Sequence, residues 1–312
     1  MSVTLTGFSP TKAEEYIINY EHPIIGEFVK LLHLRDIQKV ATNDLAFLEQ
    51  QEKLLPHLKN ALGPWIEKNR QRTFISFQEV ISFFGYLGLN GTYIPQLVKA
   101  VNHPFFNYKR GDGAFLASSG KINKCANMRF LRAVLALGFA QEDFVKQACE
   151  EYLEFNVNLE GECHVRTDGN PCAYVMVHTL RWLNEYPLHW RGKTYKTAVK
   201  NIQDYLLGYD LSTADFPRRY PEPNVNWMKF GYFRSYQSSI FEAAEALVLS
   251  GVKKHPVLKK TLDVIGSRCL NAITWKPQYV KKPWPLTILP PQRGKQIGSP
   301  WLTLRGLRIT TA

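Results

Sequence analysis

Two cysteines and two histidines lie close together in residues 161–178, GECHVRTDGNPCAYVMVH, in a chain that has only five cysteines. Thiolates and imidazoles are ligands that Zn²⁺ commonly takes in proteins. The same thiols would also suit a Cys163–Cys172 disulfide, and a thiol within about 3 to 4 Å of an imidazole would make a metal-free nucleophile. Ordinary thiols beside two helices are the remaining alternative. The segment therefore leaves these four interpretations open.

The elements that must position these residues form a repeat. Residues 113–139 and 161–187 align at a junction between a loop and a helix. The matched segments are Asn123-Lys124-Cys125-Ala126 and Asn170-Pro171-Cys172-Ala173. The helix that follows each junction is apolar on nearly all sides, which is typical of a helix buried on more than one face. Cys125 and Cys172 are therefore expected at equivalent starts of two inner helices.

Each apolar inner helix is followed by an amphipathic outer helix, so the repeated unit is a helix pair. The expected inner helices are 76–89, 126–137, 173–184, 238–251 and 300–309. The expected outer helices are 93–101, 144–155, 197–208 and 255–270. Glycines at 88, 138 and 251 mark the turns between inner and outer helices. Three less regular helices are expected before them, at 13–20, 23–34 and 43–60.

Strand signals are almost absent, so the sequence predicts an all-α fold. Long polar loops lead into the inner helices, and an isolated helix pair cannot bury its apolar face. Both features favour an α/α toroid (α/α barrel) of inner and outer helices with a central cavity. An open solenoid is the alternative. Residues 1–75 are expected to form an N-terminal helical cap or the first helices of the ring, and 76–312 the toroid repeats, within one continuous domain 1–312.

The C-terminal portion carries a resemblance to a known group of proteins. It runs from Trp227-Met228-Lys229-Phe230-Gly231-Tyr232 through SSIFEAAEALVLSG to Ser299-Pro300-Trp301-Leu302-Thr303-Leu304-Arg305. This pattern resembles α/α toroid proteins of the terpene cyclase/prenyltransferase-like kind, over roughly residues 75–310. More distantly, the chain is similar to protein prenyltransferase β-subunits and lanthionine cyclases. The resemblance implies an enzyme that acts on an apolar, isoprenoid-type substrate in the toroid cavity.

The chain departs from that pattern in its acidic motifs. It has no Asp-x-Asp-Asp protonation motif, no Gln-Trp repeats and no DDxxD site for Mg²⁺. Cyclisation by protonation and metal-assisted ionisation both lack their usual residues. The alternative is therefore a non-catalytic toroid that binds a small molecule or interacts with another protein.

The resemblance also suggests a role for the cysteine–histidine segment. Protein prenyltransferases hold zinc with Asp, Cys and His, and lanthionine cyclases hold it with two cysteines and a histidine, including an adjacent Cys-His pair. Cys163-His164 is such a pair, although the residues that follow Cys125 and His164 differ from those of lanthionine cyclases. The implied zinc ligands are Cys125, Cys163, His164 and Cys172. The implied catalytic residues are Cys163, His164, Cys172 and Asp168, although Asp168 also suits an ordinary Asp-Gly turn.

Residues 217–236 are rich in arginines and aromatic rings. Arginines at a cavity mouth could hold a diphosphate or carboxylate, and the rings could shelter an apolar or cationic group. Alternatively, the rings fill the centre of the toroid. The expected substrate-binding residues are Arg218, Arg219, Trp227, Tyr232, Arg234 and Tyr236.

The net charge of +12 favours an anionic partner. No Lys/Arg run exceeds two residues and no nucleic-acid motif is present, so specific nucleic-acid binding is not expected. Without a secretion-type N-terminus or a long apolar run, the expected location is cytoplasmic. The proline-rich segment 278–298, with basic residues at both ends, suggests either peripheral contact with a membrane or packing over its own domain. The oligomeric state is not predicted.

Overall fold

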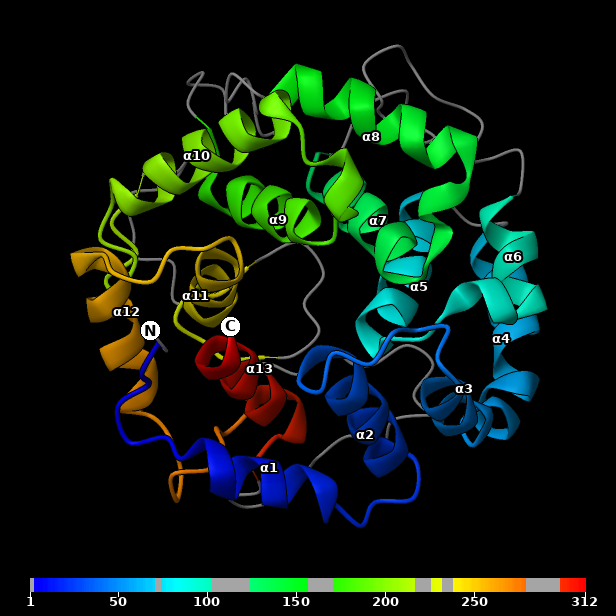
Figure 1. The fold of residues 1–312 in the computed structure, drawn as a ribbon, viewed down its shortest axis with the longest axis horizontal. Coiled ribbons are helices and arrows are strands. Elements are labelled where there is room, and N and C mark those ends of the chain that lie inside the picture. Colours follow the sequence, from blue (N-terminus) through cyan, green and yellow to red (C-terminus); the bar gives the residue numbers. More distant parts are fainter. Residues whose placement is uncertain are drawn as a thin grey trace. The chain divides into compact units, whose positions relative to one another are not determined.

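The computed structural model describes residues 3–70, 74–102, 124–156, 171–216, 226–231, 238–278 and 298–312. Within these ranges the chain forms thirteen α-helices and three short 3-10 helices (Figure 1), with isolated β-bridges but no strand. The predicted all-α class is thus confirmed for the part of the chain that the structure describes. Closure into a toroid stays a prediction. No helix in the described ranges is long and apolar enough to cross a membrane.

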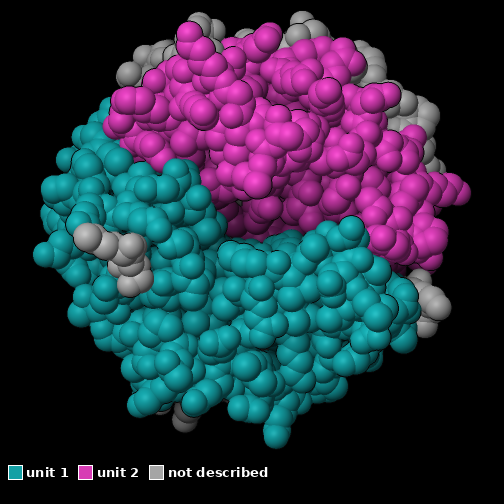
Figure 2. All heavy atoms as spheres, viewed as in Figure 1, with its two compact units in different colours: residues 1–58, 207–216, 222–312 teal, residues 59–206, 217–221 magenta. Residues whose placement is uncertain are grey.

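The chain forms two compact units, which Figure 2 shows in different colours. Unit 1 comprises residues 1–58, 207–216 and 222–312, and unit 2 comprises residues 59–206 and 217–221. In sequence, unit 2 therefore interrupts unit 1. The expected division at residue 75 stays a prediction.

Unit 2 contains three helices that pack side by side in the same order as they follow along the chain. These are α5 (Phe74–Leu87), α7 (Lys124–Ala136) and α9 (Ala173–Asn184), and α7 packs against both α5 and α9. All positions from 126 to 137 are buried, as are ten of the twelve residues of α9. These are the inner helices that their apolar sequences predict.

Outer helices accompany the inner helices of unit 2, and Figure 1 shows α8 and α10 on the outer side of α7 and α9. They are α6 (Pro95–Val101), α8 (Asp143–Asn156) and α10 (Lys193–Leu207), and α4 (Leu55–Arg70) begins in the part of the chain assigned to unit 1. In α10, buried Tyr195, Ala198, Ile202 and Leu206 follow the spacing of a single helix face. The predicted alternation of inner and outer helices is confirmed within this unit.

Two glycines set the local geometry of unit 2. Gly138 ends the turn after α7 with a φ of 88°, in the left-handed region that glycine adopts without strain. Gly85 lies where α5 meets α7, and a Cβ at this position would be 2.7 Å from the Cα of Ala133. The absence of a side chain at Gly85 therefore allows close approach of the two helices and brings Tyr86 beside Arg132.

Unit 1 is built around its last helix. Its helices are α1 (Pro10–Ile18), α2 (Ile25–Asp36), α3 (Leu45–Glu52), α11 (Ile240–Leu249), α12 (Pro256–Gly266) and α13 (Pro300–Thr311). Helix α13 packs against α1, α2 and α11, and α11 packs against α12. Ser239 and Glu242 form a capping box at the start of α11.

The prediction of a single helix at 43–60 is wrong. Helix α3 ends at Glu52, a turn covers residues 53–54, and α4 begins at Leu55. Pro56 explains the break, because proline has no backbone N–H and is well accommodated in the first turn of a new helix. Similarly, α12 ends at Gly266 and not at residue 270.

Candidate anion-binding site

Most residues that the sequence singles out lie outside the described ranges. These are Cys163, His164, Asp168, Arg218, Arg219, Tyr232, Arg234 and Tyr236. The backbone of Cys125 lies in the first turn of α7, as predicted, but its side chain is also outside the description. The roles assigned to these residues stay predictions.

Cys172 is the predicted zinc ligand whose side chain the structure describes. It is buried at the N-cap of α9, so it lies at the start of an inner helix as expected. Within the described ranges, no group of three or more His, Cys, Asp and Glu side chains could hold a metal ion. Because the other three predicted ligands lack described side chains, the zinc site stays a prediction.

Trp227 is a buried residue of unit 1. Its indole Nε1 donates a hydrogen bond to the backbone carbonyl of Leu211 at 2.8 Å, and its ring lies edge-on to Phe216 at a centroid distance of 4.8 Å. These contacts account for its burial by packing. A substrate-binding role for Trp227 stays a prediction.

Three arginines are buried on the inner helices of unit 2. Arg129 and Arg132 on α7 are 3% and 6% exposed, and Arg181 on α9 is 4% exposed. Arg129 and Arg132 are three residues apart and thus lie on the same side of α7. Arginine is rarely buried to this extent, because burial removes water from a permanent charge. The three residues therefore need a chemical explanation.

Tyr86, near the C-terminal end of α5, brings two of these arginines together. The guanidinium carbon of Arg132 lies 4.7 Å from the centre of the Tyr86 ring, and that of Arg181 lies 5.0 Å from it. Arg181 Nη1 also donates a hydrogen bond to the Tyr86 hydroxyl at 2.6 Å. A ring face stabilises a cation, so Tyr86 fixes the positions of both guanidinium groups without adding a negative charge.

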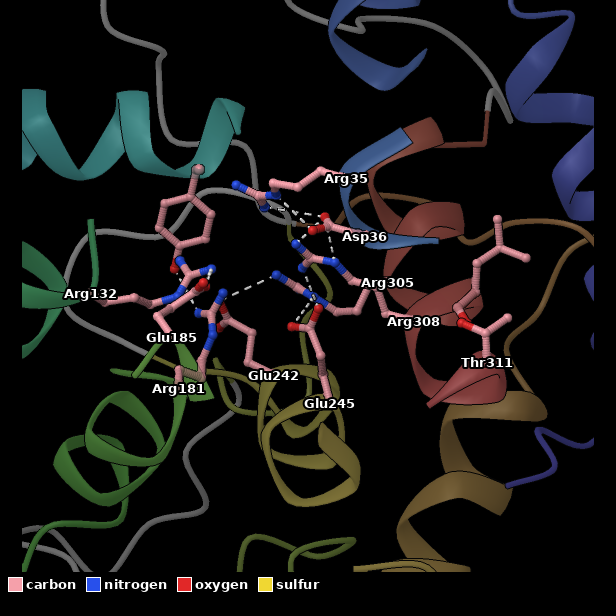
Figure 3. Close-up of polar contacts among 12 residues, drawn as sticks. Arg35, Asp36, Arg132, Arg181, Glu185, Glu242, Glu245, Arg305, Arg308 and Thr311 are labelled. Carbon is pink, nitrogen blue, oxygen red and sulfur yellow. Dashed lines mark hydrogen bonds and ion pairs between the residues drawn. The ribbon is translucent and has the colours of Figure 1, made fainter. Parts of the chain in front are cut away.

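A carboxylate reaches the same group of residues from the end of α9. Glu185, the C-cap residue of α9, accepts a hydrogen bond from Arg132 Nη2 at 3.0 Å (Figure 3). Its side chain is 27% exposed, in contrast to the 8% of the Arg132 side chain. We refer to Tyr86, Arg129, Arg132, Arg181 and Glu185 as the arginine cluster.

The electrostatics of the arginine cluster favour an anion. Two unit charges within about 10 Å of each other repel by about 1.7 kcal/mol or more at an effective dielectric constant of about 20. All three arginines take part in further interactions beyond those described above. The burial of three guanidinium groups, and not an unsatisfied donor, is therefore what suggests an anionic ligand. Guanidinium groups suit carboxylate and phosphate oxygens, which they bind through paired N–H donors.

Unit 1 contains a different kind of buried charge network (Figure 3). Arg305 donates to Glu245 at 3.0 Å and lies 3.5 Å from Glu242, and Arg308 bonds to Glu245 at 2.7 Å and to Asp36. Although burial alone would raise it, Arg308 and Arg35 hold the pKa of Asp36 well below its ordinary value. Here alternating cations and carboxylates connect α2, α11 and α13. The network is therefore best explained as a structural link.

Two further residues are explained by their burial in unit 2. His178 lies in α9 and is 2% exposed, which is typical of a histidine packed in the core. Cys149 is buried in α8, and its burial raises the pKa of the thiol from 9.0 to about 12, against smaller opposing effects of Trp182 and Tyr186. A thiol with such a pKa stays protonated at neutral pH, so Cys149 is a packing residue and not a nucleophile.

The chain matches no protein family model, no curated protein and no solved structure. The function must therefore be argued from the arginine cluster and the sequence. Sequence reasoning described 126–137 and 173–184 as apolar helices and missed the arginines within them. The signal was present, because a charged residue within an otherwise apolar inner helix has to be buried.

Proposed function

We propose that the protein binds a small molecule with an apolar body and an anionic end, and that Arg129, Arg132 and Arg181 hold the anionic end. The observation that carries this proposal is the burial of three guanidinium groups on adjacent inner helices, two of them against one tyrosine ring. The anionic group is a carboxylate, a phosphate or a diphosphate, because these match the paired donors of arginine.

The apolar body follows from the neighbours of the arginine cluster. Tyr86 is preceded on α5 by the buried rings of Phe83 and Phe84, and the remaining buried side chains of α7 are mostly apolar. A ligand that reaches the buried guanidinium groups must therefore replace water with apolar contacts along most of its length. An isoprenoid chain has this character.

The proposal extends to a catalytic role. The resemblance to terpene cyclase/prenyltransferase-like proteins favours an enzyme in an α/α toroid that acts on this ligand, with Cys163, His164, Asp168 and Cys172 as candidate catalytic residues. Zinc held by Cys125, Cys163, His164 and Cys172 would lower the pKa of a bound thiol or water. Metal analysis of the purified wild type and of Cys172→Ser tests this part, with Cys269→Ser as the matched control. Equal zinc content in all three, or none in the wild type, excludes a zinc site that contains Cys172.

Isothermal titration calorimetry with four related probes tests ligand binding. Farnesyl diphosphate, farnesyl monophosphate and farnesoic acid share one apolar chain and differ in the anionic group, and farnesol lacks it. We expect at least one anionic probe to bind more tightly than farnesol. Arg181→Gln should weaken binding of that probe by about 10- to 100-fold, the range expected when charge-assisted hydrogen bonds are lost. The affinity of Arg181→Gln for farnesol should equal that of the wild type.

Two variants control for effects on folding and on net charge. Lys196→Gln removes an exposed positive charge from α10 of unit 2 and should leave the affinities unchanged. Arg181→Lys keeps the charge but loses the planar fork, so its affinity should fall between those of the wild type and Arg181→Gln. Thermal melting identifies any variant that fails to fold. Equal binding of the anionic probes and farnesol, or equal losses in Arg181→Gln and Lys196→Gln, would contradict the proposal.

A further inference from the structure

Glu185 has a position in the arginine cluster that its own helix does not favour. It is the C-cap residue of α9, where the backbone carbonyls carry partial negative charge and disfavour a carboxylate. It is nevertheless directed at Arg132, with a distance of 3.0 Å between Oε1 and Nη2. The attraction of Arg132, and not the stability of α9, therefore accounts for the position of this carboxylate.

The arginines do not depend on Glu185 for their placement. The Tyr86 ring contacts both guanidinium groups, and the Tyr86 hydroxyl accepts a hydrogen bond from Arg181. Because Tyr86 lies on α5 and Glu185 lies at the end of α9, removal of the carboxylate leaves these contacts in place. The site would then keep these contacts and lose one negative charge.

Glu185 is also the member of the cluster with the greatest access to solvent. Its side chain is 27% exposed, and it is joined to Arg132 by one oxygen at hydrogen-bonding distance. Rotation of a glutamate side chain into water costs little, because the carboxylate regains its hydration. An incoming anion can therefore replace Glu185 without moving a helix.

We propose that Glu185 is an internal competitor that occupies Arg132 until the anionic group of the ligand displaces it. This inference rests on the proposed function and defines the ligand further. We propose that the replacing anion is an oxyanion, either a carboxylate or a phosphate, because these oxygens match the N–H donors of a guanidinium group. A ligand without such a group leaves Glu185 bound to Arg132. Glu185 therefore determines which ligands can form a bond with Arg132.

Glu185→Gln tests the inference, because it keeps the size of the side chain and removes its charge. We expect Glu185→Gln to bind the preferred anionic farnesyl probe about three- to tenfold more tightly than the wild type, and to bind farnesol with unchanged affinity. In an Arg132→Lys background, the same substitution should give a smaller gain. Glu154→Gln removes an exposed carboxylate from α8 and serves as the matched control, with no change expected.

A second measurement does not depend on the farnesyl chain. Inorganic diphosphate alone, added during thermal melting, should raise the melting temperature of Glu185→Gln more than that of the wild type or of Glu154→Gln. A purely structural role for Glu185 predicts the opposite pattern, with lower stability and weaker binding after substitution.

The outcomes separate this inference from the proposed function. If Arg181→Gln weakens anionic binding but Glu185→Gln binds equally or more weakly, the proposed function stands and Glu185 is not a competitor. If no anionic probe is preferred over farnesol, the proposed function fails. In that case, the inference also fails unless diphosphate stabilises Glu185→Gln selectively, which would identify an oxyanion site that does not take an isoprenoid ligand.

Discussion

Buried arginines have different neighbours in the two units of this protein. Arg305 and Arg308 alternate with Glu242, Glu245 and Asp36, so each charge in unit 1 lies beside one of opposite sign. In unit 2, Arg132 and Arg181 share the neutral ring of Tyr86, and Arg132 also pairs with Glu185. Removing a partner from the first arrangement is expected to cost stability, whereas the second arrangement is the one that we propose binds an anion. The position of a charge among its neighbours, and not its burial alone, thus indicates its role.

The Cys149 thiol gives a residue-scale prediction. Its pKa is raised from 9.0 to about 12 by burial, so above pH 9 the unfolded chain loses this proton before the folded protein does. Stability is therefore full below pH 9 and decreases as the pH rises toward 12, with a limiting slope of about 1.4 kcal/mol per pH unit from this group. Cys149→Ala should reduce the steepness of this alkaline loss, as measured by urea denaturation at several pH values.

The steepness, and not the absolute stability, is the quantity that decides this prediction. Cys149→Ala creates a small cavity and should lower stability by a similar amount at pH 7 and pH 8. Tyr186, whose pKa burial also raises well above its usual value, contributes a loss of the same sign in both proteins. An identical slope in the wild type and in Cys149→Ala would show that the thiol is not protonated preferentially in the folded state.

At the scale of the elements, the hydrophobic pattern predicted most of the helices. The inner helices α5, α7, α9, α11 and α13 and the outer helices α6, α8, α10 and α12 all lie where the apolar and amphipathic segments placed them. The pattern succeeded because burial on all sides and burial on one side leave different sequence signatures. It failed at 43–60, where the hydrophobic spacing continues through a turn and Pro56 was the better signal.

The candidate site was less predictable than the helices. A helix is specified by residues close in sequence, whereas the arginine cluster combines Tyr86 with residues 43 or more positions later through the packing of α5, α7 and α9. The contact of Gly85 with Ala133 sets this packing, and nothing in the sequence near either residue identifies its partner. Sequence could have identified the buried arginines individually, but not their shared tyrosine.

Gly138 gives an element-scale prediction. Its φ of 88° is unfavourable for other residues, and a Cβ would lie 3.1 Å from Oδ1 of Asn90, which accepts hydrogen bonds from the Thr92 backbone and side chain. We expect Gly138→Ala to destabilise the protein by about 1 to 2 kcal/mol, as measured by urea denaturation.

Two other glycines separate the causes of this loss. Gly251 has a φ of 101°, and a Cβ at this position would have no heavy atom within 4 Å, so Gly251→Ala reports backbone strain alone. Gly192 has neither a positive φ nor a close neighbour, so Gly192→Ala should cost little or stabilise slightly. A loss at residue 138 no greater than that at residue 192 would show that the left-handed turn is not required.

At the scale of the whole molecule, the charge of +12 bears on how an anionic ligand arrives. A positive protein attracts an anion before contact, and salt screens this attraction. Between about 0.01 M and about 1 M salt, the screening length falls from about 30 Å to about 3 Å. We expect the association rate of the preferred anionic probe to fall over this range in stopped-flow measurements, with a smaller change in its dissociation rate because the arginine cluster is buried.

The farnesol rate is the internal reference for that measurement, because farnesol has no charge to attract. Salt should leave its association rate nearly unchanged. If both rates fall by the same factor, salt acts on the protein and not on the encounter, and long-range attraction does not contribute to binding.

The order of the two units along the chain has a consequence for biosynthesis. Residues 59–206 of unit 2 are contiguous, whereas unit 1 packs around α13, which follows all its other helices. A ribosome therefore releases the main segment of unit 2 before it releases the helix that completes unit 1. Until then the apolar faces of α1, α2 and α11 have no central helix to cover them. The nascent chain therefore depends most on chaperones in the interval between the release of α11 and the release of α13.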